Sequence, residues 1–142
     1  MTERIVVDAS VVLGWALGDA PFERVGRLFT ALTKARALVP AIWQAEVANV
    51  LLVKERQRRI DAAFVGKVLR HLEDFDIDID VAGATTAFDQ ALPIARRHQL
   101  SVYDAIYLDL AIREQAPLAT LDGVLDAAAT KESRSFFAPP AP

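Results

Sequence analysis

The sequence predicts an α/β domain in which amphipathic helices pack on a mainly parallel sheet. Short apolar runs such as Ile5–Val7 are typical of strands that are buried on both faces. Between such runs lie segments whose apolar residues recur every three or four positions, which is the spacing of a helix with one buried face. Alternation of short strands with amphipathic helices favours parallel strands joined by helical connections.

The remaining strands are expected at four places along the chain. After Ile5–Val7, the next short apolar strand is Ala37–Val39. The stretch DFDIDIDVA, residues 74–82, alternates apolar and acidic residues, so this strand is expected to have one solvent-exposed face. A further strand is expected at Pro117–Leu121, and Phe136–Phe137 is a candidate edge strand.

The helices are placed by their apolar stripes and by their capping residues. Ser10 is expected to cap a short helix that ends at Leu17, and Asp61 is expected to cap a later one. Pro93 is expected to kink or divide the helix that ends near Arg97. The expected helical ranges are 10–17, 22–35, 42–56, 61–72, 85–97, 101–114 and 124–131.

The length of 142 residues fits one domain, which we place at residues 1–138, with a disordered tail at 139–142. Cysteine is absent from the sequence, which excludes disulfides, thiolate metal sites and cysteine nucleophiles and fits a reducing compartment. The chain opens with no apolar run long enough for a secretory signal. We therefore expect a soluble, cytoplasmic protein.

The charge distribution gives mixed indications about nucleic acid. The formal net charge is −3, whereas nucleic-acid-binding domains usually present a basic surface. Basic side chains nevertheless gather near the ends of two expected helices, at Arg56, Arg58 and Arg59 and at Arg96 and Arg97. Such residues either contact an RNA backbone or complement a helix dipole in solvent, and both interpretations stay open.

Two aspartates are expected at the ends of strands. Asp8 follows Ile5–Val7 directly, and Asp122 follows the stretch PLATL. In open parallel sheets, ligands bind beyond the carboxyl ends of the strands, so these side chains meet if their strands are neighbours. Each also has a plainer interpretation, because Asp8 suits a turn into a helix and Asp122-Gly123 is a common turn pair. Taken singly, the plainer interpretation is favoured for both.

A third aspartate, Asp104, stands in the first turn of an expected helix. Ser101 and Asp104 have the spacing of a capping box, which alone would explain the acid. Capping is compatible with catalysis, because the side chain still lies in the first turn and points toward the strand ends. Asp109, five residues on, is turned by roughly 140° around the helix and is expected on its solvated face.

Glu46 lies on an apolar expected helix, residues 42–56. A glutamate there lies either at the rim of the apolar face, which is the common case, or in a polar pocket. Asn49 lies one turn along and favours the pocket interpretation.

Taken together, the four acids indicate a cation site. Two carboxylates ~4 Å apart repel by about 4 kcal/mol at an effective dielectric of 20, so converging acids raise one another's pKa or bind a cation. An all-oxygen set without histidine or cysteine suits Mg²⁺ or Mn²⁺ rather than Zn²⁺. Ser10 stands two residues after Asp8 and Thr120 two residues before Asp122, so both hydroxyls can serve the same site.

In four segments the sequence resembles the PIN-domain ribonucleases, in particular the VapC-like toxins of bacterial toxin–antitoxin pairs. The segments are IVVDASVVLGWAL, PAIWQAEVANVL, SVYDAIYLDLA and LATLDGVL, and their order and spacing agree with the family. The resemblance covers nearly the whole chain; each motif alone is weak, and the ordered set is fairly specific. At the last motif the family often has more acidic or polar residues than Asp122, Gly123 and Asp126 provide here.

The resemblance implies a fold, an activity and a set of site residues. The implied fold is a three-layer α/β/α sandwich, and the implied activity is that of an Mg²⁺- or Mn²⁺-dependent endoribonuclease. Homodimers and inhibition by a small cognate antitoxin are implied as well. The catalytic and metal-binding roles fall to Asp8, Glu46, Asp104 and Asp122. Ser10 and Thr120 fall at supporting positions of the family, and we add Asn49 because of its place beside Glu46.

Other functions stay open on the residues alone. A phosphotransfer or phosphatase domain would phosphorylate Asp8, but a dehalogenase-like site would have an aspartate where Ser10 stands, and the acidic pair and late lysine of a receiver-like domain are not evident. A catalytically silent interaction module would keep only the fold, and retention of all four acids argues against it. A serine–histidine–aspartate hydrolase is remote, because neither His71 nor His98 is preceded by a Gly-x-Ser-x-Gly elbow.

Overall fold

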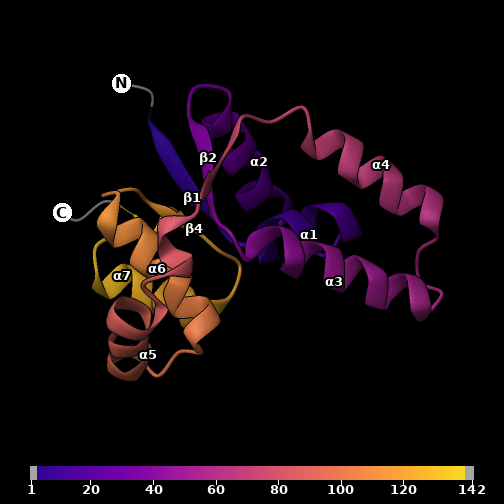
Figure 1. Cartoon of the computed structure of the whole chain (residues 1–142). Coiled ribbons are helices and arrows are strands. Elements are labelled where there is room, and N and C mark those ends of the chain that lie inside the picture. Colours follow the sequence, from indigo (N-terminus) through magenta and orange to yellow (C-terminus); the bar gives the residue numbers. More distant parts are fainter. Residues whose placement is uncertain (1–2, 140–142) are drawn as a thin grey trace.

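Figure 1 shows a parallel sheet between two groups of helices in the computed structural model, which describes residues 3–139. Within these residues the sheet has four strands in the order β3-β2-β1-β4, and all are parallel. The strands are β1 (Arg4–Val7), β2 (Arg36–Pro40), β3 (Ile77–Asp80) and β4 (Leu118–Ala119). Because β1 pairs with both β2 and β4, the carboxyl ends of β1 and β4 are neighbours. The prediction of an α/β fold with a mainly parallel sheet is confirmed.

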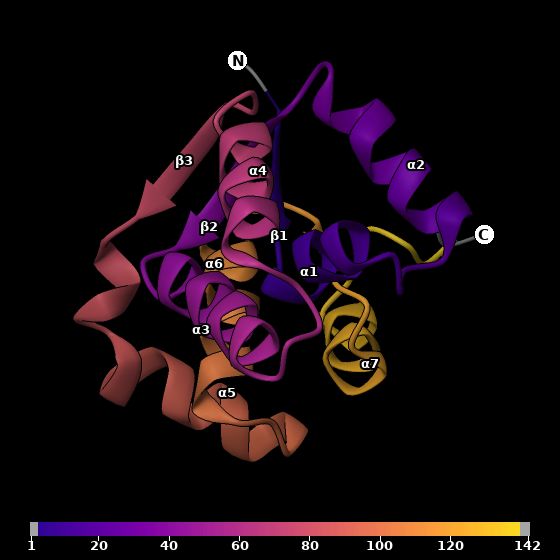
Figure 2. The same ribbon diagram turned by 90° about the vertical axis from the view of Figure 1, so that its right-hand side faces the viewer.

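The helices lie on both faces of this sheet. They are α1 (Ala9–Leu17), α2 (Phe22–Leu32), α3 (Trp43–Arg56), α4 (Ala62–Leu72), α5 (Leu92–His98), α6 (Val102–Arg113) and α7 (Gly123–Lys131). Helices α1 to α4 cover one face and α5 to α7 the other (Figure 1). Figure 2 looks from the side of α3 and α4, with α6 behind them. The molecule is therefore the three-layer α/β/α sandwich that the resemblance implied.

Helix α6 forms the centre of the second helical layer. Its residues from Ala105 to Ala111 are all buried, because α6 packs on β1 and β2 as well as on α5 and α7. A helix that is enclosed in this way carries apolar residues around most of its circumference, and Asp109 is the exception among residues 105–111. The core beneath it is built from strand side chains such as Val6, Leu38 and Leu118.

The expected helix at 85–97 is divided. A 3₁₀ turn at Ala82–Ala84 and a π turn at Ala87–Ala91 precede α5, and Pro93 stands in the first turn of α5. Proline is tolerated there because the first helical N–H groups have no partner within the helix. The prediction that Pro93 divides this segment is confirmed.

Two boundaries differ from the predictions. Helix α1 begins at Ala9, with Asp8 rather than Ser10 at the capping position, because the Ser10 hydroxyl bonds the Asp8 carboxylate instead. After α7, the chain forms one parallel bridge from Ser135 to Leu118 instead of a strand at Phe136–Phe137, although the Phe136 N–H does donate to Leu118.

The alternating stretch forms the edge strand β3. Its two acids are half-buried and paired, since Arg36 donates to Asp78 at 2.7 Å and Arg113 donates to Asp80 at 2.9 Å, whereas Ile79 between them is exposed. Among residues 3–139, no helix is long and apolar enough to cross a membrane. The predicted tail at 139–142 lies outside the described residues except for its first position.

Candidate active site

Asp8 directly follows β1 and lies at the carboxyl end of the sheet. Its backbone N–H donates to the carbonyl of Ala119 at 3.0 Å, which carries the pairing of β1 with β4 one residue further. The residue is only 6% exposed, and its side chain makes no capping bond to α1. The plainer interpretation, a capping acid at a turn, therefore does not account for Asp8.

Two hydroxyl groups hold the Asp8 carboxylate. Ser10 Oγ donates to Asp8 Oδ2 at 2.6 Å, and Thr120 Oγ1 donates to the same oxygen at 2.8 Å. These hydroxyls in turn accept backbone N–H groups of Leu121 and Asp122, each at 3.0 Å. The loop after β4 is thereby tied to Asp8, and because both hydroxyls take Oδ2, they leave Oδ1 for another partner.

The environment of Asp8 disfavours the charged form of its carboxyl group. Burial raises its pKa above the ordinary value, because the charged form loses hydration. The hydrogen bonds from Ser10 and Thr120 lower the pKa in part, and the charge of Asp122 raises it further. A carboxyl held in this way favours either a proton or a cation.

Glu46 lies in the first turn of α3 and is half-buried. Tyr107, a fully buried residue of α6, donates its hydroxyl to Glu46 Oε1 at 2.7 Å. Burial raises the pKa of Glu46, and the charges of Asp8 and Asp104 raise it further. These contacts favour the polar pocket over the rim for Glu46. Asn49, one turn beyond, is exposed, and in the part of the chain that the structure describes its side chain makes no hydrogen bond to the acids.

Asp104 lies in the first turn of α6, where its N–H donates to Ser101 Oγ at 3.1 Å. This is one half of the expected capping box. Burial raises the pKa of Asp104, and the charges of Asp8 and Asp122 add to the rise. The Asp104 carboxylate is therefore close enough to the acids at the ends of β1 and β4 to interact electrostatically with both, as the catalytic interpretation requires.

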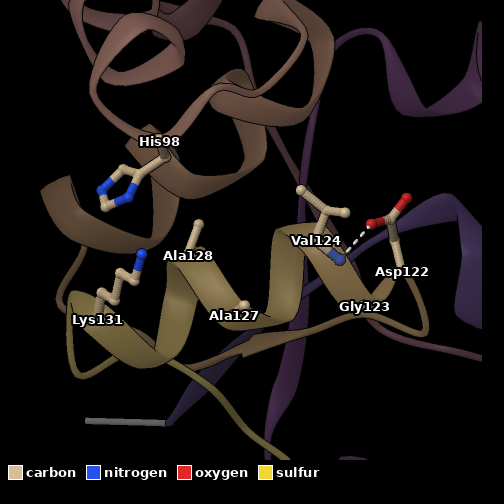
Figure 3. A pocket seen from close by; sticks show the side chains of 7 residues that line it. All are labelled: His98, Asp122, Gly123, Val124, Ala127, Ala128 and Lys131. Atoms are coloured by element: carbon tan, nitrogen blue, oxygen red, sulfur yellow. Dashed lines mark hydrogen bonds between the residues drawn. The ribbon is translucent and has the colours of Figure 1, made fainter.

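Asp122 caps α7. Its Oδ1 accepts the backbone N–H groups of Val124 at 2.9 Å and Leu125 at 3.0 Å. The plainer interpretation therefore holds for this oxygen. Figure 3 shows the second carboxylate oxygen turned away from the helix backbone.

The donor set fits a hard divalent cation. Across residues 3–139, no three acidic or histidine side chains are gathered tightly enough to enclose an ion by themselves. Mg²⁺ does not need such a cage, because it keeps several waters and takes only one or two carboxylates. Mutual influence among Asp8, Glu46, Asp104 and Asp122, all of them oxygen donors, fits a hydrated Mg²⁺ or Mn²⁺.

Two features of α6 were not predicted. Tyr107 was missed, although it follows Asp104 by three residues and so shares its helix face. Asp109 was expected in solvent, but it is 3% exposed and accepts Arg113 Nε at 3.0 Å. That prediction was wrong because it assumed one solvated face, whereas both sides of α6 are covered.

The basic residues fall in two different environments. Arg56, Arg58 and Arg59 are exposed at the turn between α3 and α4, about 15 Å along α3 from Glu46. Arg96 is exposed as well. Arg97 is engaged, because its guanidinium donates to Glu132 Oε1 at 2.7 Å.

Fold and site together define a three-layer α/β/α domain with an acidic site at the carboxyl ends of its parallel strands. The model of the PIN domain family matches residues 5–131, and the chain belongs to this family, as the resemblance predicted.

Relatives are similar over most of their length. Ribonuclease VapC3 of Pyrobaculum aerophilum is 28% identical over 119 residues, which are 84% of this chain and 89% of that protein. The crystal structure of PAE2754 from the same organism has a TM-score of 0.66 at 25% identity, with 90% of this chain and 81% of that one covered. The structure of VapBC2 from Rickettsia felis, bound to a DNA fragment from its promoter, has a TM-score of 0.63 at 15% identity and covers 94% and 93%. At that identity the likeness concerns the fold alone.

Proposed function

We propose that this protein is a divalent-metal-dependent endoribonuclease that hydrolyses phosphodiester bonds of RNA with water as the nucleophile. The observation that carries the proposal is the buried Asp8 carboxylate at the end of β1, whose pKa is raised by burial and by a neighbouring acid. The chain's membership of the PIN family and its similarity to a ribonuclease support RNA as the proposed substrate.

Each acid has a part in this proposal. We assign the first ion to Asp8, Asp104 and Asp122, of which one or two would bind it directly and the rest would bind its waters. We assign Glu46 to a second ion or to the attacking water. When bound by these acids, Mg²⁺ or Mn²⁺ would lower the pKa of a coordinated water and would offset charge on the phosphoryl group.

The surrounding residues keep these acids in position. Ser10 and Thr120 hold Asp8 through one carboxylate oxygen, and Tyr107 holds Glu46. Asn49 is kept as a supporting residue because it lies one turn beyond Glu46 on α3. Of the basic residues, Arg56, Arg58, Arg59 and Arg96 are exposed and are assigned to the RNA backbone, whereas Arg97 would first have to leave Glu132.

We infer that the protein acts in the cytoplasm as the toxin of a toxin–antitoxin pair. Several of its structural neighbours come from such pairs, among them VapBC2 and a toxin–antitoxin complex from Klebsiella pneumoniae. The partners in this proposal are a cognate antitoxin protein and a second copy of the chain.

Cleavage of labelled single-stranded and structured RNA tests the activity. We expect cutting with Mg²⁺ or Mn²⁺, no cutting with EDTA, and a loss of at least 100-fold in Asp8→Asn that remains folded by circular dichroism. Divalent-independent cutting, or full activity in Asp8→Asn, would contradict the proposal.

The rival functions predict other outcomes. An interaction module that kept only the fold would bind its partner and cut no RNA with any metal. A phosphotransfer domain would form an acyl phosphate on Asp8 after incubation with acetyl phosphate, which mass spectrometry detects as the added phosphoryl group.

A further inference from the structure

A hollow of about 620 Å³ adjoins the acidic site between the end of α5 and one face of α7. Figure 3 shows it from close by, with Asp122 at one end and with His98 and Lys131 at the other. Its lining residues are His98, Asp122, Gly123, Val124, Ala127, Ala128 and Lys131. The proposed function gives no role to this hollow.

The wall formed by α7 is open because its side chains are small. Gly123 and Ala127 are exposed and leave room above the helix, and Val124 adds an apolar surface that is 62% exposed. Positions 124, 127, 128 and 131 recur at helical spacing and so share one face of α7. Such a wall suits the flat face of a nucleobase or a ribose ring.

The opposite wall is preformed. The His98 side chain is only 7% exposed, and its Nε2 lies 2.8 Å from Glu132 Oε1. Arg97 donates to the same carboxylate oxygen at 2.7 Å. Glu132, just beyond α7, therefore fastens the end of α5 and keeps the hollow open without a ligand.

The charge at the two ends differs in sign. Within residues 3–139, the Lys131 ammonium forms no ion pair, whereas the Arg97 charge is offset by Glu132. Lys131 is exposed and extends toward His98 (Figure 3). About 13 Å of helix separates it from Asp122. An uncompensated cation at this place suits a phosphate.

We propose that this hollow holds a nucleotide of the RNA strand about two positions from the scissile bond, with its base or ribose on the Val124–Ala127 face and its phosphate on Lys131. This inference rests on the proposed ribonuclease function and names a substrate subsite for it. The strand would then run along α7 from the acids toward the end of α5.

Binding of RNA without cleavage tests the subsite. The probe is a fluorescein-labelled pool of 12-nucleotide single-stranded RNA of random sequence, measured by anisotropy with Asp8→Asn in Mg²⁺. Adding Lys131→Gln should weaken binding three- to tenfold and reduce the slope of log K against log salt by about 0.7, the value for one phosphate contact on a single strand. Adding Ala127→Leu should weaken binding by a similar factor and leave the slope unchanged, since it fills the hollow without removing charge.

Matched controls lie on α4, away from the hollow (Figure 1). Lys67→Gln removes an exposed lysine and Ala63→Leu enlarges an exposed alanine, and neither should change the affinity. If Lys131→Gln and Ala127→Leu bind as tightly as these controls while the wild type cleaves RNA, the subsite is wrong and the ribonuclease stands. If the wild type neither binds nor cleaves the pool, both proposals fail.

A free nucleotide carries the same base, ribose and phosphate groups as a nucleotide of the strand, so it could bind the same hollow. We expect 1 mM adenosine monophosphate to leave RNA binding unchanged, because a strand is also held by the exposed arginines assigned to its backbone. Displacement of the RNA to the level of Lys131→Gln would instead identify a pocket for free nucleotide and overturn the assignment to RNA.

Discussion

At the scale of one residue, the buried Asp8 carboxylate that the proposed function needs lowers the stability of the metal-free fold. A carboxylate that is 6% exposed loses hydration, and two hydroxyl bonds restore only part of it. We predict that Asp8→Asn raises the free energy of unfolding of the metal-free protein by roughly 1 kcal/mol, while abolishing cleavage. The amide oxygen can still accept the hydroxyls of Ser10 and Thr120. Urea unfolding at pH 7 in EDTA measures the change.

The same variant has a pH signature. The pKa values of Asp8, Glu46 and Asp104 are raised, so the folded protein holds these protons more tightly than the unfolded chain. Their contribution to stability is present below the ordinary values of 3.8 and 4.5 and is lost as pH rises through the raised values. The advantage of Asp8→Asn should therefore grow as the pH rises from 3.8 through the raised pKa of Asp8. Asp19→Asn, at an exposed position, is the control for the substitution itself, and a destabilised Asp8→Asn would refute the argument.

Tyr107 gives a second test at this scale. Tyr107→Phe removes the hydroxyl that donates to Glu46 and leaves a half-buried carboxylate without it. Loss of such a supporting bond costs 10- to 100-fold in activity or metal affinity in metalloenzymes, so we expect a fall of about tenfold in the cleavage rate. Mn²⁺ affinity measured by electron paramagnetic resonance should fall with it.

The control for this change stands one turn earlier on the same helix. Tyr103 is 65% exposed, so Tyr103→Phe should leave both Mn²⁺ affinity and unfolding unchanged. Equal losses in the two variants would show that the effect is not specific to the bond with Glu46.

The candidate acids and the two hydroxyls that bond Asp8 could be named from the sequence, but the partner of Glu46 could not. Asp8 and Asp122 were found because they end apolar runs, and strand ends gather ligands in parallel sheets. The bond from Tyr107 to Glu46 joins residues that are 61 positions apart, so no local pattern reports it. The proposed subsite at Lys131 was missed for the same reason. It depends on the ion pair between Glu132 and Arg97, which leaves Lys131 without an acidic partner among residues 3–139 and which no local pattern reports.

At the scale of elements, Arg113 connects α6 to the edge strand. It donates to Asp109 at 3.0 Å on its own helix and to Asp80 at 2.9 Å at the end of β3. We predict that Arg113→Met destabilises the protein by about 3–5 kcal/mol, because it leaves two poorly exposed carboxylates without their cation. Thermal unfolding measures this loss. Arg70→Met, at an exposed position of α4, should change stability by less than about 1 kcal/mol.

The positions of the helices and strands were predicted more accurately from the sequence than the burial of their side chains. Periodicity located α2, α3 and α4 and the strands β1 and β2 to within a few residues of the predictions. It also located α6, but it misjudged the burial of Asp109, because a helix covered on both sides has no solvated face. At 85–97 it predicted the division near Pro93 but not the π turn at Ala87–Ala91 that precedes α5.

At the scale of the whole molecule, the acids come from separate parts of the sandwich. Asp8 ends the central strand β1 and Glu46 begins α3 in one helical layer, whereas Asp104 and Asp122 begin α6 and α7 in the other. A cation among them would therefore join both layers across the sheet end. The unfolded chain has no such arrangement and binds the ion weakly.

This arrangement makes metal binding a measure of global stability. An ion that binds only the folded state at 100 times its Kd adds about 2.7 kcal/mol, which for a domain of this size raises the unfolding temperature by roughly 5–15 °C. We predict such a rise for the wild type with excess Mg²⁺ or Mn²⁺ at pH 7, and reversal by EDTA. NaCl at the same ionic strength should not reproduce it, since screening alone does not join the layers. The rise should largely disappear in Asp8→Asn, which removes the most buried of the four donors; an equal rise in that variant would place the ion elsewhere on the molecule.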